Sequence, residues 1–485
     1  MFPFEHIITI DKEKKLPVYR QIAISIINAI RNGNVKPGMA LPGTRELAKT
    51  LGVHRKTVIA AYEELNAQDW ILIIPRKQVR VSESIPTLQP QKWNAQDSSL
   101  SYENNFDLPI HQSKKDPSQQ ELTVLPEIFI DDGHPDIRLS PIDELLKIYR
   151  SYTSRSFSIK KAVVGTTQGT LKLREELSRY LSVTRGLNIS ADNLLITHGA
   201  QMSIYLAAQL LLQDGDIIVS GKPGYPIANS AFEKTKASVI EVPVDENGLD
   251  INALEKMCKK KKITAVYLIP HHHYPTTVTL SVERRMKLLE LSNQYSFAII
   301  EDDYDYDYHY SSSPYLPLAS GAHKGNVIYI GSFSKILGSS IRIGFMVAPK
   351  NFIQEAVVLR KAIDVGGDGY MQNALAELIK SGDLGRYLKK AKKSYHQRRD
   401  YLNILLQHHL SPYISFTLPD GGLSVWIQLK HPYSVNTLKT HLQLQIKRID
   451  EEENAFRLGF ASKNEKELEE VVLFMKKILT NRYSI

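Results

Sequence analysis

A lysine and an arginine that share one loop are the first residues whose chemistry stands out. They are Lys335 and Arg342, in the stretch GSFSKILGSSIRIG at 331–344. A lysine amine can form an imine with an aldehyde, and the rigid N–H fork of a guanidinium suits a phosphate group. Lys335 directly follows a predicted strand. One loop can therefore place the amine and the guanidinium around one small molecule.

Three further segments carry small or polar residues directly after predicted strands. Thr197–Gln201 joins a strand to a helix, and its small residues let the free amides of the helix start approach a phosphate. Asp302 and Tyr304 lie at the end of a second strand, and Tyr225 follows a third. Ligands of open α/β sheets bind outside the carboxyl ends of the strands, so we expect these segments to border one site.

The elements that would position these residues alternate along the chain. Short apolar runs predict strands at 194–197, 217–220, 265–269, 297–301, 327–331 and 344–348. Helical stretches fall between or after them, for example at 201–213, 282–294 and 370–381. This α/β alternation predicts a mostly parallel sheet with helices on both faces. Residues 385–485 predict a long amphipathic helix followed by a smaller α/β unit.

The order of these segments resembles that of fold-type I aminotransferases, which bind pyridoxal 5′-phosphate. The resemblance implies that Lys335 forms the Schiff base (internal aldimine) with the cofactor and that Asp302 keeps the pyridine nitrogen protonated. It also implies that Tyr304 donates to the ring hydroxyl oxygen and that Arg457 binds the carboxylate of an effector. The implied cofactor-binding residues are Gly199, Ala200, Gln201, Tyr225, Asp302, Tyr304, Ser332, Ser334, Lys335 and Arg342.

Two details of this resemblance are specific to the chain. The sequence does not decide whether Asp302 or Asp303 faces the ring, and we choose Asp302 because the matching motif usually uses the first of the pair. The family's Asn-Pro-Thr-Gly turn reads Tyr-Pro-Thr-Thr at 274–277. The asparagine that would assist the ring hydroxyl is missing, which favours sensing over turnover.

Residues 1–82 have the features of a DNA-binding head. They hold 13 basic and 7 acidic side chains, so most of the net charge of +9 lies there, and a basic excess suits an anionic polymer. We predict a helix after Pro17, a second helix capped by Thr44 and ending at Leu51, and a third helix from about 54 to 68. Residues 71–74 and 78–81 predict a small hairpin.

The stretch from 41 to 58 resembles the GntR-family winged helix-turn-helix signature. The resemblance implies that Arg55, Lys56 and Thr57 meet base edges in the major groove from the first turn of the third helix. It implies phosphate contacts for Thr44 and Arg45. At the wing tip this family usually carries Gly-x-Gly, whereas this chain has a proline and basic residues at 75–80.

Residues 83–125 are rich in Ser, Gln, Asn and Pro and predict a linker of roughly 40 residues. The predicted domains are therefore a head at 1–82 and a body at 126–485, with a small subdomain at 385–485. In this order the parts resemble MocR/GabR-type transcriptional regulators.

The resemblance implies a regulator that binds double-stranded promoter DNA and senses an amine, an amino acid or pyridoxal phosphate itself. It implies a head-to-tail homodimer that reads repeated half-sites. The alternative is an active aminotransferase that carries a regulatory head. Residual half-transamination would be compatible with the regulator as well.

Other sequence features narrow the class of protein. Cys258 is the single cysteine, no secretory signal is recognisable, and no apolar run reaches the about 18–20 residues that span a bilayer. We therefore expect a cytoplasmic protein without a membrane partner. We expect no metal site at His271–His273, because successive side chains on an extended chain alternate in direction. This segment is predicted to be a loop that borders the cofactor pocket.

Overall fold

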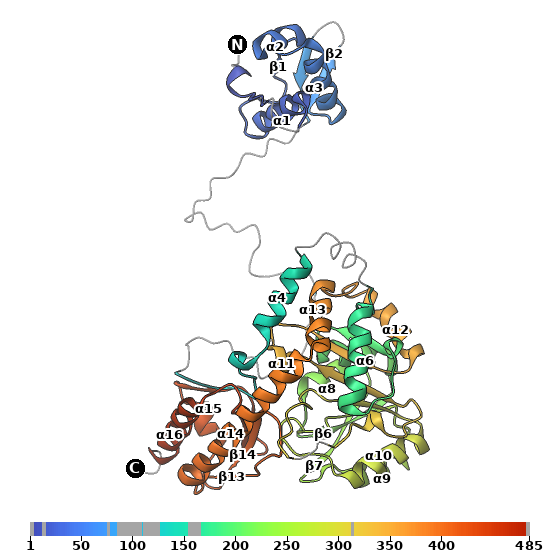
Figure 1. Ribbon diagram of the computed structural model, residues 1–485, viewed down its shortest axis with the longest axis vertical. Coiled ribbons are helices and arrows are strands. Elements are labelled where there is room, and N and C mark those ends of the chain that lie inside the picture. The colour runs from blue at the N-terminus through green and yellow to red at the C-terminus, as the bar shows by residue number, and fades with distance from the viewer. Residues whose placement is uncertain are drawn as a thin grey trace. The chain divides into compact units, whose positions relative to one another are not determined.

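The computed structural model describes residues 4–11, 16–74, 78–84, 109, 127–153, 166–311 and 315–481. Its chain divides into two compact units, Met1–Gln112 and Ser113–Ile485 (Figure 1). We call the first unit the head and the second the body. Most of the linker predicted at 83–125 lies outside the described residues, and so do residues 75–77 of the predicted wing.

The head contains the three helices and the hairpin that the sequence predicts. The helices are α1 (Val18–Arg31), α2 (Thr44–Leu51) and α3 (Arg55–Ala67), after a short 3₁₀ turn, η1 (Phe4–His6). The strands are β1 (Ala40–Leu41), β2 (Ile71–Ile74) and β3 (Gln78–Val81), in the antiparallel order β1–β3–β2. Ile22, Ile26 and Ile30 of α1 pack with Val58 and Leu65 of α3 in one core. Helical spacing puts these apolar residues on the facing sides of both helices.

The start of α2 corrects one prediction. Gly43 is the N-cap of this helix, and Thr44 is already its first helical residue. The expectation that Thr44 caps α2 was therefore wrong, because a residue with helical backbone angles cannot direct its hydroxyl to the free amides ahead of it. The hydroxyl of Thr44 accepts a hydrogen bond from Nε of Arg55 at 3.3 Å instead. His54 caps α3, with Nδ1 accepting from the amide of Lys56.

In the described part of the body, the main sheet has eight strands. In spatial order they are β5 (Leu194–Thr197), β12 (Gly344–Val347), β11 (Val327–Ser332), β10 (Ala298–Asp302), β9 (Ala265–Leu268), β6 (Ile217–Lys222), β7 (Ser238–Asp245) and β8 (Gly248–Leu249). The strands from β11 to β7 are parallel, whereas β12 is antiparallel to both of its neighbours and β8 to β7. The predicted mostly parallel sheet is confirmed.

Helices cover both faces of this sheet. On one face pack α7 (Ala200–Leu211), α8 (Pro226–Glu233) and α12 (Lys350–Lys361). On the other pack α9 (Ile251–Cys258) and α10 (Val282–Tyr295). Neighbouring residues in a strand serve opposite faces, so Ile300 belongs to the first core and Ile299 to the second.

The remaining elements complete the body. Helices α4 (Ile142–Thr153), α6 (Leu171–Arg185) and α13 (Gly369–Lys380) pack together beside the sheet, and three short 3₁₀ turns are η2 (Ile137–Leu139), η3 (Ala191–Asn193) and η4 (Leu318–Ser320). The carboxyl-terminal part begins with the long helix α14 (Asp383–Leu410).

Its antiparallel sheet has the order β13–β14–β17–β16, formed by β13 (Ile414–Phe416), β14 (Ser424–Leu429), β17 (Ala455–Gly459) and β16 (Ile449–Asp450). The helices α15 (Val435–Lys439) and α16 (Glu465–Asn481) accompany it. A strand from the start of the body, β4 (Ile128–Ile130), pairs in parallel with β15 (Leu444–Ile446). No helix in the described segments is both long and apolar enough to cross a membrane.

The topology collects the predicted site residues at one edge. Strands β6, β9, β10 and β11 are parallel, and β5 runs in the same direction because it pairs antiparallel with the reversed strand β12. Helix α7 starts after β5, and the short helix α11 (Ser334–Leu337) starts after β11. The carboxyl ends of these strands therefore meet where a ligand site is expected.

Candidate functional site

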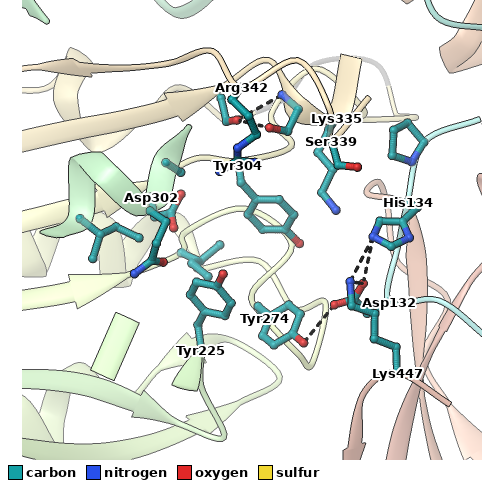
Figure 2. Close-up of a pocket in the computed structure, with 17 residues that line it drawn as sticks. Asp132, His134, Tyr225, Tyr274, Asp302, Tyr304, Lys335, Ser339, Arg342 and Lys447 are labelled. Carbon is teal, nitrogen blue, oxygen red and sulfur yellow. Dashed lines mark hydrogen bonds and ion pairs between the residues drawn. The ribbon is translucent and has the colours of Figure 1, made fainter. Parts of the chain in front are cut away.

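A cavity of about 270 Å³ opens at this edge of the sheet (Figure 2). It lies within the body and receives side chains from β10, β11, α7 and the segments that follow β4 and β15. Its lining residues are Asp132, His134, Pro135, Ala200, Gln201, Ile204, Tyr225, Ile269, Tyr274, Asp302, Tyr304, Ser332, Ser334, Lys335, Ser339, Arg342 and Lys447. Nine of the ten predicted cofactor residues line this cavity, and the tenth, Gly199, directly precedes the lining residue Ala200.

Lys335 reaches the cavity from α11. Its Nζ donates a hydrogen bond to the carbonyl oxygen of Gly133 at 2.6 Å and lies 5.6 Å from the centre of the Tyr304 ring. Burial lowers the pKa of Lys335, and the nearby carboxylate of Asp132 opposes that change only in part. A lysine with a lowered pKa holds more of its amine in the nucleophilic form.

The two adjacent aspartates at the end of β10, Asp302 and Asp303, have different surroundings. Asp302 lines the cavity, and its Oδ2 accepts a hydrogen bond from the hydroxyl of Tyr267 at 2.9 Å. Oδ1 of Asp302 is buried without a partner, and burial raises the pKa of this carboxyl to about 7. Asp303 does not line the cavity, because its oxygens bond to His271 Nδ1 and to the hydroxyl of Tyr329. A cationic donor placed at Asp302 would relieve the buried, unpartnered oxygen.

The start of α7 and Arg342 form an anion-binding corner. Gly199 is the N-cap of α7 with φ of 85°, a conformation that favours glycine. A Cβ at this position would lie 2.7 Å from Nη2 of Arg342, so glycine is needed for the guanidinium to approach the helix start. Nη2 of Arg342 donates to the carbonyl of His198 at 3.2 Å. Free amides, the helix dipole and a guanidinium together favour a phosphate here.

Three other predicted residues supply polar atoms to the same wall. The hydroxyls of Ser332 and Ser334 lie 3.0 Å apart, next to Lys335 in the chain. The amide nitrogen of Gln201 donates to the carbonyl of Ile227, while its Oε1 is buried without a hydrogen-bond partner.

Three tyrosines form the wall that faces Lys335 (Figure 2). Tyr225 and Tyr274 meet edge to face, with ring centres 5.3 Å apart. Tyr274 occupies the position at which the resembled family has asparagine, and its hydroxyl contacts Oδ2 of Asp132 at 3.3 Å. The hydroxyl of Tyr304 donates to the carbonyl of His272 at 3.1 Å. The missing asparagine is thus replaced by an aromatic side chain that shapes the cavity.

Arg457 lies behind this tyrosine wall. Its side chain is 1% exposed and does not line the cavity. The guanidinium donates to the hydroxyl of Ser424, to the hydroxyl of Tyr304 at 2.8 Å and to the carbonyl of Pro275 at 3.4 Å. It also lies 4.8 Å from the centre of the Tyr274 ring. The structure therefore places Arg457 beside the site but encloses it with protein atoms.

Sequence reasoning missed the charged residue Lys447, which lines the wall of the cavity away from Asp302 (Figure 2). Asp132 Oδ1 lies 3.1 Å from Nζ of Lys447, and this Nζ lies 3.1 Å from Nε2 of His134. Asp132 and His134 follow β4 at the start of the described part of the body. Nothing in the local sequence marked Lys447, because it reaches the cavity only through the pairing of β15 with β4.

The three consecutive histidines at 271–273 bond to separate acceptors. His271 pairs with Asp303, His272 with Asp305, and His273 with the carbonyl of Pro223. Each imidazole is buried. These hydrogen bonds indicate that the three histidines have a structural role in the described part of the body.

In the head, the predicted DNA-contacting residues gather at the start of α3. Arg55 and Lys56 are exposed in the first turn of this helix, and Thr57 is half-buried. Arg45 of α2 is also exposed, and Thr44 is tied to Arg55 by the hydrogen bond described above. The hydrogen bond between Thr44 and Arg55 joins the starts of the two helices.

Comparison with known proteins agrees with both units. Residues 18–81 match the family of bacterial regulatory proteins of the gntR type, and residues 158–474 match the aminotransferase class I and II family. The chain is 30% identical over 431 residues to the uncharacterised HTH-type transcriptional regulator YdfD of Bacillus subtilis, covering 88% of each chain. It is 26% identical over 425 residues to the probable rhizopine catabolism regulatory protein MocR of Rhizobium meliloti, covering 86% of this chain and 83% of that one.

The body is also similar in structure to a solved aminotransferase. Pyrococcus horikoshii kynurenine aminotransferase, solved in complex with PMP, aligns with a TM-score of 0.68 and 27% identity over 75% of this chain and 93% of its own. This fold and family imply pyridoxal 5′-phosphate as the cofactor. The unpartnered Oδ1 of Asp302 and the close approach of Arg342 to Gly199 at the start of α7 fit such a group. The chain thus belongs to the MocR-type transcriptional regulators, which join a GntR-family helix-turn-helix to an aminotransferase class I and II body.

Proposed function

We propose that this chain is a transcriptional regulator that senses a primary amine or amino acid at Lys335 and transmits the signal to DNA. The observation that carries the proposal is a single cavity that collects Lys335, Asp302 and Arg342, in a chain whose residues 18–81 match a DNA-binding family. A family match alone supports DNA binding. The cavity adds a place where a small molecule can act.

The cavity residues divide by chemistry. Lys335 would hold pyridoxal phosphate covalently through Nζ, Asp302 would pair with the pyridine nitrogen, and Arg342 with the α7 amides would bind the phosphate. Other residues proposed to touch the cofactor are Gly199, Ala200, Gln201, Tyr225, Tyr304, Ser332 and Ser334. When bound, the cofactor supplies an electrophilic carbon that reacts reversibly with primary amines.

Lys335 also offers a route by which the signal could leave the site. Nζ of Lys335 donates to the carbonyl of Gly133 at 2.6 Å. Gly133 follows β4, the first strand described after the predicted linker. An amine that displaces Lys335 would therefore change a contact in the segment that leads to the linker and head. Such coupling requires two states of that segment with different affinity for DNA.

The head would read DNA from the start of α3. We propose base contacts for Arg55, Lys56 and Thr57 and phosphate contacts for Thr44 and Arg45. A head-to-tail homodimer would present two heads to repeated half-sites.

The proposal is tested with the full-length protein loaded with pyridoxal phosphate. Bound genomic DNA is first identified by footprinting, and the protein is then titrated with primary amines while cofactor absorbance and DNA binding are both recorded. We expect at least one amine to change both signals at the same concentration. If DNA binding responds to loading with the cofactor but to no amine, the cofactor itself is the signal. If neither the cofactor nor any amine alters DNA binding, the sensor proposal is wrong.

An active aminotransferase is the second candidate, because Lys335, Asp302 and Arg342 are also the groups that turnover requires. Multiple-turnover assays with amino donors and keto acids separate the two. A rate above about one per second is typical of enzymes and would favour the aminotransferase.

A further inference from the structure

The cavity contains charged groups that the cofactor does not need. In the proposed arrangement, Arg342 serves the phosphate, Asp302 the ring nitrogen and Lys335 the covalent attachment. Among the described lining residues, Asp132 and Lys447 are the charged side chains that remain. Figure 2 shows them with His134 on the side of the cavity away from Asp302. This wall is where the part of an effector beyond its amine would lie.

This inference rests on the proposed function. We propose that Lys447 binds an acidic group of the effector, so that the preferred effector is an amine that also carries a carboxylate or another anion. Lys447 would then determine specificity, a role that the resembled family gives to the arginine at position 457.

Accessibility favours Lys447 over Arg457 as the first anion contact. The side chain of Lys447 is 43% exposed and lines the cavity. The side chain of Arg457 is enclosed, and its contacts with Ser424, Pro275 and Tyr304 hold it behind the tyrosine wall. An acid entering the cavity in this structure meets the ammonium without any rearrangement, whereas it reaches the guanidinium only if Tyr274 or Tyr304 moves.

The ammonium of Lys447 is held in place and keeps capacity for another acceptor. It contacts Asp132 Oδ1 and His134 Nε2, each at 3.1 Å, and an ammonium has three N–H donors. The backbone around its partners is fixed, since Asp131 accepts from the amides of Gly133 and His134 at 2.8 and 2.7 Å. An acid would therefore bind a positioned donor and lose little further side-chain entropy.

The carboxylate of Asp132 is surrounded by cations that favour its charged form. Burial acts to raise the pKa of Asp132, but Lys335, Lys447 and Arg457 outweigh burial and lower it to about 2. Burial and the charges of Lys447 and Lys335 also lower the pKa of His134, so its ring is neutral and accepts from Lys447. Lys447 therefore lies between a charged carboxylate and a neutral nitrogen acceptor, and its remaining N–H donor is available to an acidic group.

The test compares matched amines by their effect on cofactor absorbance. The holo protein is titrated with ω-amino acids of two to six carbons, with the corresponding alkylamines, and with L-glutamate against L-2-aminopentanoate. We expect tighter binding of the acid-bearing member. We expect Lys447→Met to weaken that member about tenfold and to leave the alkylamine within about twofold. Lys447→Arg should retain the preference. An aminoalkyl sulfonate in the panel shows whether the anion must be a carboxylate.

Lys350→Met is the matched control, because Lys350 is an exposed lysine that pairs with Asp192 at 2.9 Å and does not line the cavity. It should leave every affinity unchanged. If Lys447→Met keeps the wild-type preference for acids, or weakens both members equally, this inference is wrong while the sensor proposal stands. If no amine perturbs the absorbance of the wild-type protein, the sensor proposal fails and this inference fails with it.

Discussion

The head and the body hold their functional charges in different ways. In the head, Arg55 and Lys56 are exposed cations on the first turn of α3. In the body, Asp302 and Arg457 are buried and Lys335 is half-buried, and most of their polar atoms have protein partners. Exposed charges are strongly screened by salt and contribute little to folding, whereas buried charges depend on specific partners. The same kind of substitution should therefore have different consequences in the two units.

The largest expected effect is that of Lys335→Ala in the body. Removal of Nζ should abolish the covalent attachment of pyridoxal phosphate, so that dialysis of the variant removes all cofactor absorbance. Amines should then leave DNA binding unchanged, while the head keeps its affinity for DNA in the absence of amine. A cofactor band that survives dialysis would show that another residue holds the cofactor.

The adjacent aspartates give the second prediction. Asp302→Asn should weaken cofactor affinity by about 3 kcal/mol, roughly a hundredfold, because it removes the buried charge that we propose to pair with the ring nitrogen. Asp303→Asn should instead lower the melting temperature, since Asp303 bonds to His271 and Tyr329 away from the cavity. Equilibrium titration with the cofactor and thermal unfolding of both variants measure the contrast. The reverse pattern would exchange the roles of the two residues.

In the head, Arg55→Ala should weaken DNA binding by about 1–3 kcal/mol without changing thermal stability. Arg20→Ala is a suitable control, because Arg20 is an exposed arginine that pairs with Glu64 at 3.4 Å. Raising the salt concentration should weaken DNA binding steeply and cofactor binding only slightly, because Asp302 of the cofactor site is buried. Equal salt dependence of the two activities would remove the contrast between the units.

The smallest effect concerns acid stability. The pKa of Asp132 is lowered from 3.8 to about 2 in the folded protein, so its charge stabilises the fold above pH 4. That contribution, about 1–2 kcal/mol, should disappear as the pH falls from 4 to 2. Asp132→Asn should show a weaker loss of stability over this range than the wild type, measured by urea unfolding without cofactor. Parallel pH curves for the two proteins would contradict the assignment.

Much of the architecture was predictable because it depends on local patterns. The six predicted strands of the main sheet occur within a few residues of their expected positions, since continuous apolar runs predict buried parallel strands. Strand β7 was not predicted, because its residues are mostly half-exposed and include Pro243. The cap of α2 was assigned to the wrong residue, because Gly43 and Thr44 are both acceptable N-caps by sequence.

In the site, too, the residues in local motifs were predictable from the sequence, and the residues placed by tertiary contacts were not. Lys335, Asp302 and Arg342 occur in recognisable motifs at strand ends, and the structure brings them to one cavity. Lys447 has no such motif, because its position depends on a strand pairing between segments more than 300 residues apart in the chain. The enclosure of Arg457 also depends on side chains from distant segments, among them Ser424 and Tyr304. Tertiary contacts of this kind cannot be read from residue types and spacing.

The most direct test of the central claim is borohydride reduction of the full-length protein loaded with pyridoxal phosphate, followed by peptide mass mapping. We predict one stable adduct, located on Lys335, and its loss when a sensed amine is added before reduction. No adduct, or an adduct confined to other lysines, would contradict the assignment of this cavity as the sensor site.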